Sequence, residues 1–263
     1  MTAVRVVVVL AIALVAAAAP AAAQTAFPKS GYYVAMGDSV AAGTGALPVT
    51  NGYVYQLYEQ GVFGQKQDLA FGNASVRGAR SWELRDGQVP QVICTEPAQR
   101  PTVVTITAGA NDVFRGDFDV IGIAQRVAEA VNILLNNPHL PSPVLDPFTG
   151  LPCRPLSNVT ILVSNYYSIP HPVEAVFAQL DALLRSFDLA LRFSIAQVPV
   201  PAGSRVAIVD LYTPSLGRRG LVTVERRDGF PGPGPFDFDP HPTNLGHSFI
   251  AREFEKAWRS LQP

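Results

Sequence analysis

One serine of the sequence stands where it could act as a nucleophile. Ser39 closes the tripeptide Gly37-Asp38-Ser39, which follows the apolar run 33–36 and precedes a glycine-rich stretch at 40–46. A serine hydroxyl attacks an acyl carbon only when a base takes its proton and hydrogen-bond donors hold the oxyanion that forms. The same tripeptide also suits an ordinary turn. The rest of the chain must therefore supply a base and donors if Ser39 is to carry out acyl transfer.

One histidine is flanked by carboxylates. His241 lies between two prolines in DPHP, with Asp239 two residues before it and Asp237 four residues before it. A nearby carboxylate can orient one ring nitrogen so that the other acts as a base. A solvent-exposed loop histidine is the alternative interpretation. The other histidines are expected in loops or, for the last, at a helix start where it contacts a backbone carbonyl: His139, His171 and His247.

Two further positions are candidates for oxyanion donors. Asn111, in the segment TAGANDV at 107–113, carries a side-chain amide. Gly78, in NASVRGARSWEL, permits a positive φ or a close approach of the backbone to a substrate. The structural alternatives are a helix cap at Asn111 and a turn at Gly78. Taken alone, Asn111 and Gly78 each favour the structural role. The case for a catalytic site therefore rests on the order in which the serine, the glycine, the asparagine and the histidine follow one another along the chain.

In that order, the groups resemble the four sequence blocks of the SGNH hydrolases, a branch of the GDSL esterases and lipases. The blocks are GDSVAAG at 37–43, the glycine at 78, GAND at 109–112 and DPHP at 239–242. The resemblance extends over residues 32–257, with helical and strand patterns between the blocks. It implies a flavodoxin-like fold and a metal-free acyl-transfer mechanism.

The resemblance also implies a role for each matching residue. Ser39 corresponds to the nucleophile and His241 to the general base, while the backbone amides of Ser39 and Gly78 and the side chain of Asn111 form the oxyanion hole. This chain departs from the family pattern at one position. The orienting aspartate usually lies three residues before the histidine, where Phe238 stands here. We expect Asp239 to take that role, with Asp237 or a main-chain carbonyl as the alternatives.

The implied activity is hydrolysis of carboxylic esters by a serine esterase or lipase, with a small-molecule or lipid ester as substrate. A carbohydrate acetylesterase or a phospholipase of the same fold is an alternative. A non-catalytic protein that binds lipid or carbohydrate is the alternative outside enzymes. We expect the acyl pocket to be shaped by the proline-rich segments 136–155 and 228–242 and by three aromatic side chains: Tyr53, Phe114 and Phe236.

The elements that must position these groups follow from hydrophobic patterning. Continuous apolar runs predict buried strands at 32–36, 69–73, 102–107, 158–164 and 205–211. Apolar residues at three- and four-residue spacing predict helices over 120–134, 176–195 and 245–261. Alternating strands and helices predict a three-layer α/β/α domain around a doubly wound parallel sheet. Ligands bind beyond the carboxyl ends of such strands, which is where Ser39 and the segment 108–112 are expected.

The first 23 residues have the layout of a secretory signal peptide, with Arg5, an apolar core and small residues ending at Ala23. Cleavage there leaves one domain over 24–263; a retained anchor is the alternative. We therefore expect a secreted or cell-envelope protein that makes no stable membrane insertion. A formal net charge of -1 without blocks of like charge gives no reason to expect nucleic acid as a partner. Nothing in the sequence indicates an oligomeric state.

The two cysteines, Cys94 and Cys153, predict a disulfide in an exported chain, with two free thiols as the alternative. The histidines and cysteines lack metal-ligand spacing, and no phosphate-binding glycine loop is found, so we expect neither a metal nor a cofactor. Two glycosylation sequons begin at Asn73 and Asn158. Whether they are modified depends on the host.

Overall fold

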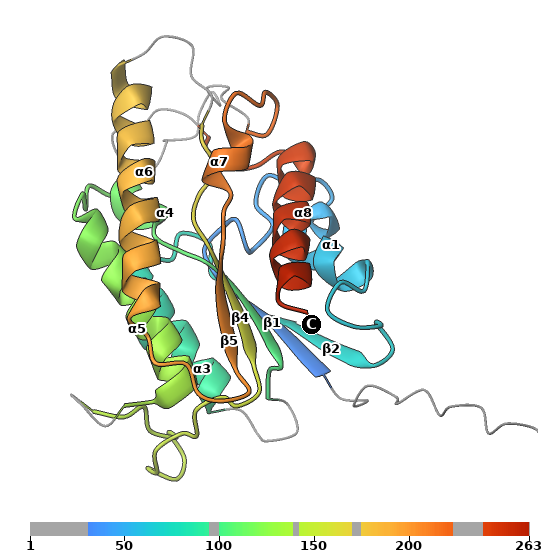
Figure 1. Ribbon diagram of the computed structural model, residues 1–263, viewed down its shortest axis with the longest axis vertical. Coiled ribbons are helices and arrows are strands. Elements are labelled where there is room, and N and C mark those ends of the chain that lie inside the picture. Colours follow the sequence, from blue (N-terminus) through green and yellow to red (C-terminus); the bar gives the residue numbers. More distant parts are fainter. Residues whose placement is uncertain (1–30, 95–99, 139–141, 170–174, 223–238, 263) are drawn as a thin grey trace, which may run out of the picture.

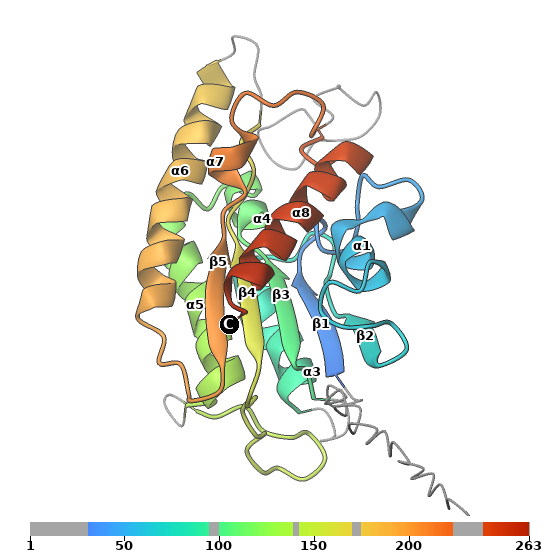
Figure 2. The same cartoon turned by 45° about the vertical axis from the view of Figure 1, so that its right-hand side comes forward.

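The computed structural model describes residues 31–94, 100–138, 142–169, 175–222 and 239–262. Helices cover both faces of a central sheet, giving three layers (Figures 1 and 2). The expected signal peptide lies outside the described residues, and so do Phe236, Asp237, His139 and His171. Across the described ranges, no helix combines the length and the apolar character that a membrane span requires.

In these ranges five parallel strands form the sheet, in the order β2-β1-β3-β4-β5. This is the order of flavodoxin-like doubly wound folds, in which the winding reverses between β1 and β3. The predicted fold class is confirmed, and the strand boundaries differ from the predicted ones by at most two residues at either end. The strands are β1 (Gly31–Gly37), β2 (Leu69–Asn73), β3 (Val103–Thr107), β4 (Thr160–Ser164) and β5 (Arg205–Val209).

The helices divide between the two faces of the sheet. Helices α1 (Tyr53–Glu59) and α8 (Asn244–Ser260) cover one face, and α3 (Val89–Ile93), α5 (Val120–Asn136) and α6 (Ala175–Ala196) cover the other (Figures 1 and 2). Strand β3 reads VVTIT and is buried along its whole length. Branched side chains suit a pleated surface that is covered on both sides, so this strand anchors the centre of the core.

Side-chain caps mark where two of the long helices begin. The Asp119 carboxylate accepts a hydrogen bond from the Gly122 amide (3.0 Å) at the start of α5. The Thr243 hydroxyl accepts one from the Gly246 amide (3.2 Å) at the start of α8. Both caps satisfy amide groups that the first turn of a helix leaves unpaired. The shorter elements are η1 (Val49–Asn51), α2 (Ser81–Glu83), the π-helical turn η2 (Leu84–Gln88), α4 (Ala110–Phe114) and α7 (Tyr212–Ser215).

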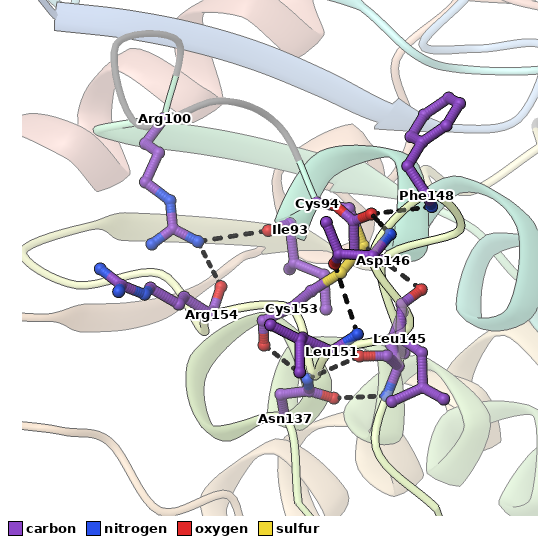
Figure 3. The surroundings of a disulfide bond; sticks show 12 residues. Ile93, Cys94, Arg100, Asn137, Leu145, Asp146, Phe148, Leu151, Cys153 and Arg154 are labelled. Atoms are coloured by element: carbon purple, nitrogen blue, oxygen red, sulfur yellow. Dashed lines mark hydrogen bonds between the residues drawn. A yellow bond between two sulfur atoms is a disulfide. The ribbon is translucent and has the colours of Figure 1, made fainter.

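The predicted disulfide joins Cys94 and Cys153, 59 residues apart (Figure 3). It links the end of α3 to the segment that precedes β4. The Asn137 side chain holds the same segment, because its amide donates to the Cys153 carbonyl (2.7 Å) and its oxygen accepts from the Val144 amide (2.8 Å). Described residues of the proline-rich segment 136–155 therefore lie at the amino ends of the strands. The expectation that this segment shapes an acyl pocket beside Ser39 is wrong.

Candidate active site

The turn after β1 is fixed at the residue that precedes Asp38 and Ser39. Gly37 has a φ of +124°, and a Cβ at this position would lie 1.9 Å from the Thr107 carbonyl oxygen of β3. The buried Gln88 side chain accepts from the Gly37 amide (2.7 Å) and donates to its carbonyl (2.8 Å). Only glycine meets both the conformation and the close approach. The end of β1 is thereby held at the carboxyl edge of the sheet, with Ser39 in the turn that follows.

Ser39, His241 and Asp239 form one hydrogen-bonded chain. The Ser39 Oγ lies 2.8 Å from His241 Nε2, and His241 Nδ1 lies 2.5 Å from Asp239 Oδ1. The same carboxylate oxygen accepts a hydrogen bond from the His241 backbone amide (3.1 Å). The Asp239 side chain thus folds back over its own turn. This is why its carboxylate reaches the His241 ring although the two residues lie only two positions apart in the sequence. With Nδ1–H donated to Asp239, Nε2 is left to accept the Ser39 proton.

The backbone that carries His241 is anchored on both sides. The Tyr167 hydroxyl, in the segment after β4, donates to the Pro240 carbonyl (2.7 Å). Pro242 forms an isolated bridge with Val222. The imidazole therefore comes from a short segment pinned between the sheet edge and the start of α8. Asp237 lies outside the described residues, so Asp239 is the carboxylate that the structure brings to the ring.

The expected oxyanion donors lie around the same edge. Asn111 is the second residue of α4, directly after β3, and one of its two amide hydrogens is donated to the Ala79 carbonyl (3.0 Å). Gly78 has a φ of +78°, which favours glycine. In the described part of the chain, no group accepts a hydrogen bond from the backbone amide of Ser39 or Gly78. These two amides and the Asn111 side chain are the donors that the family resemblance assigns to the oxyanion hole.

Asp112 is a buried group that sequence reasoning did not identify. Its side chain is 1% exposed and accepts from the Ser81 amide (2.8 Å) and the Ser81 hydroxyl (2.8 Å). Arg126 of α5 also contacts it, at 3.4 Å. Because Ser81 follows Gly78 closely and Asp112 follows Asn111, this carboxylate holds the two expected donors at a fixed separation. Asp112 is the last residue of the block GAND, so the sequence did mark its position. The family resemblance, however, gives a role only to Asn111 in that block.

Asp38 is a second buried carboxylate, directly before Ser39. It is 1% exposed, accepts a hydrogen bond from the Val40 amide (2.9 Å), and accepts another from the Tyr166 hydroxyl. Burial raises the pKa of Asp38 to about 6, against the opposing effect of these hydrogen bonds. These contacts fix the turn that presents Ser39, and the one with Tyr166 joins residues 128 apart in the sequence.

An apolar pocket opens beside Ser39 and His241. Asn111 lies at its edge, and the aromatic rings of Tyr166 and Tyr167 contribute to its wall. Among the three aromatic residues predicted to shape it, Phe114 does so, whereas Tyr53 is fully buried in the core against Phe254. Aliphatic and aromatic side chains from α4, from the segment after β4 and from α6 form most of the remaining lining: Val113, Phe114, Ile169, Leu180, Leu184 and Phe187.

His247 makes no hydrogen bond to Ser39 or His241 among the described residues and joins α8 to the loop that follows Ser39. It is fully buried; its Nε2 donates to the Thr44 carbonyl (3.0 Å) and its Nδ1 accepts from the Tyr53 amide (3.2 Å). The predicted contact with a backbone carbonyl is confirmed. Burial lowers the pKa of His247 to about 4, so the ring is neutral at pH 7. Among the described residues, no cluster of three or more histidine, cysteine or carboxylate side chains is arranged to hold a metal ion.

Known proteins resemble this chain in sequence profile and in fold. The sequence profile described as GDSL-like Lipase/Acylhydrolase matches residues 33–254. A solved carbohydrate esterase family 3 structure from Talaromyces cellulolyticus is similar, with a TM-score of 0.53 and 17% identity over 88% of this chain and 97% of that chain. An extracellular lipase from Streptomyces rimosus has a TM-score of 0.51 and 19% identity over 86% of this chain and 99% of that chain.

A carbohydrate acetylesterase family member from Sinorhizobium meliloti has a TM-score of 0.53 and 13% identity, over 88% of this chain and 98% of that chain. At such identities the solved structures show a shared fold. No curated protein sequence matches the chain. The profile, by contrast, spans both the turn that carries Ser39 and the segment that carries His241. The chain therefore belongs to the GDSL-like lipase/acylhydrolase family and is a carboxylic ester hydrolase.

Proposed function

We propose that this hydrolase is a secreted serine esterase or lipase that works through an acyl-enzyme on Ser39. The observation that carries the proposal is the hydrogen-bonded chain from Ser39 Oγ to His241 Nε2 (2.8 Å) and from His241 Nδ1 to Asp239 (2.5 Å). A nucleophile, a base and an orienting carboxylate in this geometry are what serine-based acyl transfer requires.

In the first half of the reaction, His241 Nε2 takes the proton of Ser39 as Oγ attacks the ester carbonyl carbon. Asp239 fixes the tautomer of His241 and stabilises the imidazolium that forms. The negative charge that develops on the carbonyl oxygen is held by the amides of Ser39 and Gly78 and the side chain of Asn111. One such donor typically contributes about 3 to 4 kcal/mol of transition-state stabilisation.

The second half regenerates the serine. When the tetrahedral intermediate collapses, the carbon–oxygen bond to the alcohol breaks and His241 gives its proton to the departing alkoxide. A water molecule then attacks the acyl-enzyme while His241 takes one of its protons. The acid leaves as Ser39 Oγ recovers that proton. Both steps use the same base and the same oxyanion donors.

Export is supported by the layout of residues 1–23 and by the Cys94–Cys153 disulfide. Disulfides persist mainly in oxidising compartments outside the cytosol. The similar Streptomyces rimosus protein is an extracellular lipase. A carbohydrate acetylesterase is the second candidate, because two of the similar structures bear carbohydrate esterase descriptions.

The test is hydrolysis of p-nitrophenyl butyrate by the wild type and by Ser39→Ala. Removing the nucleophile is expected to abolish turnover while the melting temperature stays close to that of the wild type. Ser186→Ala, which changes an exposed serine on α6, is the matched control and should retain full activity. A fluorophosphonate should label the wild type at Ser39. Retained activity in Ser39→Ala would disprove the nucleophile, and an unlabelled, inactive wild type would favour a binding protein.

A further inference from the structure

The apolar pocket beside Ser39 has a composition that narrows the choice of substrate. Its lining from α6 consists of hydrocarbon side chains, among them Leu180 and Phe187, which are 2% and 3% exposed. A wall of such side chains offers a polar ligand no hydrogen-bonding partner, whereas an apolar ligand gains by leaving water for it. The pocket therefore fits a hydrocarbon group that lies next to the reacting carbonyl.

The hydroxyl groups of the two tyrosines in the wall are already engaged. The Tyr166 hydroxyl donates its proton to Asp38, and the Tyr167 hydroxyl donates its proton to the Pro240 carbonyl (2.7 Å). A sugar placed in this pocket would bury hydroxyl groups against rings whose own protons are committed elsewhere, which is unfavourable. A methylene chain leaves no polar group unpaired. The wall thus discriminates between a hydrocarbon and a carbohydrate at this side of Ser39.

The order of the reaction assigns the pocket to one half of the ester. The alcohol must leave first, past His241, whereas the acyl group stays attached to Ser39, which is only 8% exposed. Asn111 at the pocket edge holds the carbonyl oxygen in the proposed mechanism. A pocket that begins at Ser39 and continues between α4 and α6 is suited to the half that remains bound.

We propose that this pocket binds the acyl chain, so that the protein prefers esters of medium-chain aliphatic acids to acetates. This inference rests on Ser39 being the nucleophile of the proposed function. Leu183 on α6 is the specificity-determining residue best suited to a test, because it lines the pocket yet is only half-buried. Full burial of each added methylene is worth about fourfold in kcat/KM.

The experiment measures kcat/KM for p-nitrophenyl acetate, butyrate, hexanoate and octanoate. The wild type should improve from acetate to hexanoate by at least tenfold. Leu183→Trp fills the pocket and should lower the ratio of octanoate to acetate at least tenfold. Leu189→Trp makes the same change on the outer face of α6, where the side chain is 69% exposed, and should leave the chain-length profile unchanged. Leu183→Ala should move the acyl-chain length with the highest kcat/KM toward longer chains. This variant tests the proposal even if Leu183→Trp does not fold.

Two isomeric esters test the assignment to the acyl half. The wild type should hydrolyse methyl hexanoate at least tenfold faster than pentyl acetate. Faster hydrolysis of pentyl acetate would place the pocket on the alcohol side and overturn the proposal. An acetate optimum in the wild type, or equal shifts in Leu183→Trp and Leu189→Trp, would overturn it as well. If only the acyl-chain proposal fails, Ser39→Ala still abolishes hydrolysis of these esters. If the proposed function fails, Ser39→Ala keeps its activity on every ester.

Discussion

At the scale of single residues, the spacing of Asp239 and His241 is the feature that sets this site apart. The aspartate stands two residues before the histidine, and one of its oxygens serves both the ring nitrogen and the backbone amide of His241. Because the Asp239 carboxylate accepts from the amide of its own turn, it can reach the His241 ring from two residues away. The usual family spacing is three residues. The geometry thus supports Asp239 as the orienting group.

Asp239→Asn is expected to lower kcat by about 10³- to 10⁴-fold, because an amide that presents its NH₂ group to Nδ1 stabilises the wrong tautomer and not the imidazolium. Initial rates with p-nitrophenyl butyrate measure the effect. Asp237→Asn is the control and should stay within about threefold of the wild type. Equal activity of wild type and Asp239→Asn, with a large loss in Asp237→Asn, would transfer the role to Asp237.

At the scale of elements, the donors around Ser39 depend on how short segments are tied to one another. Asp112 connects the start of α2 to α4 through Ser81, and Arg126 adds a contact from α5. None of these short segments has enough residues to fix its own position. The spacing of Gly78 and Asn111 therefore depends on this buried carboxylate together with the direct bond from the Asn111 amide to the Ala79 carbonyl.

Asp112→Asn should lower the free energy of unfolding by about 1 to 3 kcal/mol, because one of its buried contacts becomes a donor facing a donor. It should also reduce kcat more than it changes KM, since displaced oxyanion donors act in the transition state. Urea unfolding and steady-state kinetics provide the two readouts. Asp117→Asn removes the other, more exposed partner of Arg126 and should leave kcat unchanged. A wild-type kcat in Asp112→Asn would contradict this role.

Strands and long helices were predictable from the sequence, whereas short helical turns were not. The run VVTIT of β3 and the apolar spacing of α5 carry their own signal, because each buries a continuous face. Helical turns of three to five residues, such as α2, η2 and α4, are too short to show a helical periodicity. The same holds for tertiary pairs: the contact between Asp38 and Tyr166 joins residues 128 apart. Tyr53 was misplaced because an aromatic residue in α1 looks the same whether it faces a substrate or the core.

At the scale of the whole molecule, His247 links the last helix to the first third of the chain. Its two ring nitrogens bind the Thr44 carbonyl and the Tyr53 amide inside the protein. These partners suit a neutral ring that donates at Nε2 and accepts at Nδ1. Protonation would place a second donor against the Tyr53 amide and bury a charge, which is why burial lowers the pKa of His247 to about 4.

The depressed pKa of His247 makes stability depend on pH. Between pH 6.5 and about 4 the unfolded chain binds a proton at this site that the folded chain does not, so stability is lost as the pH falls through this range. The loss at pH 4.5 amounts to about 2 to 3 kcal/mol relative to pH 7.5.

His247→Gln does not titrate, so its loss of stability between pH 7.5 and 4.5 should be smaller than that of the wild type by this amount. Urea unfolding at both pH values gives the comparison. The raised pKa of Asp38 acts in the opposite direction and is common to both proteins. Parallel losses in the two proteins would refute the role of His247.

The bond between Ser39 and His241 spans 202 residues. During synthesis Ser39 emerges long before His241, and their hydrogen bond can form only once the segment that carries His241 has reached the end of β1. Contacts of such long sequence range close late, because the chain must first lose the entropy of a very large loop. A chain that ends before His241 keeps Ser39 but lacks its hydrogen-bonding partner, so we expect it to hydrolyse no ester.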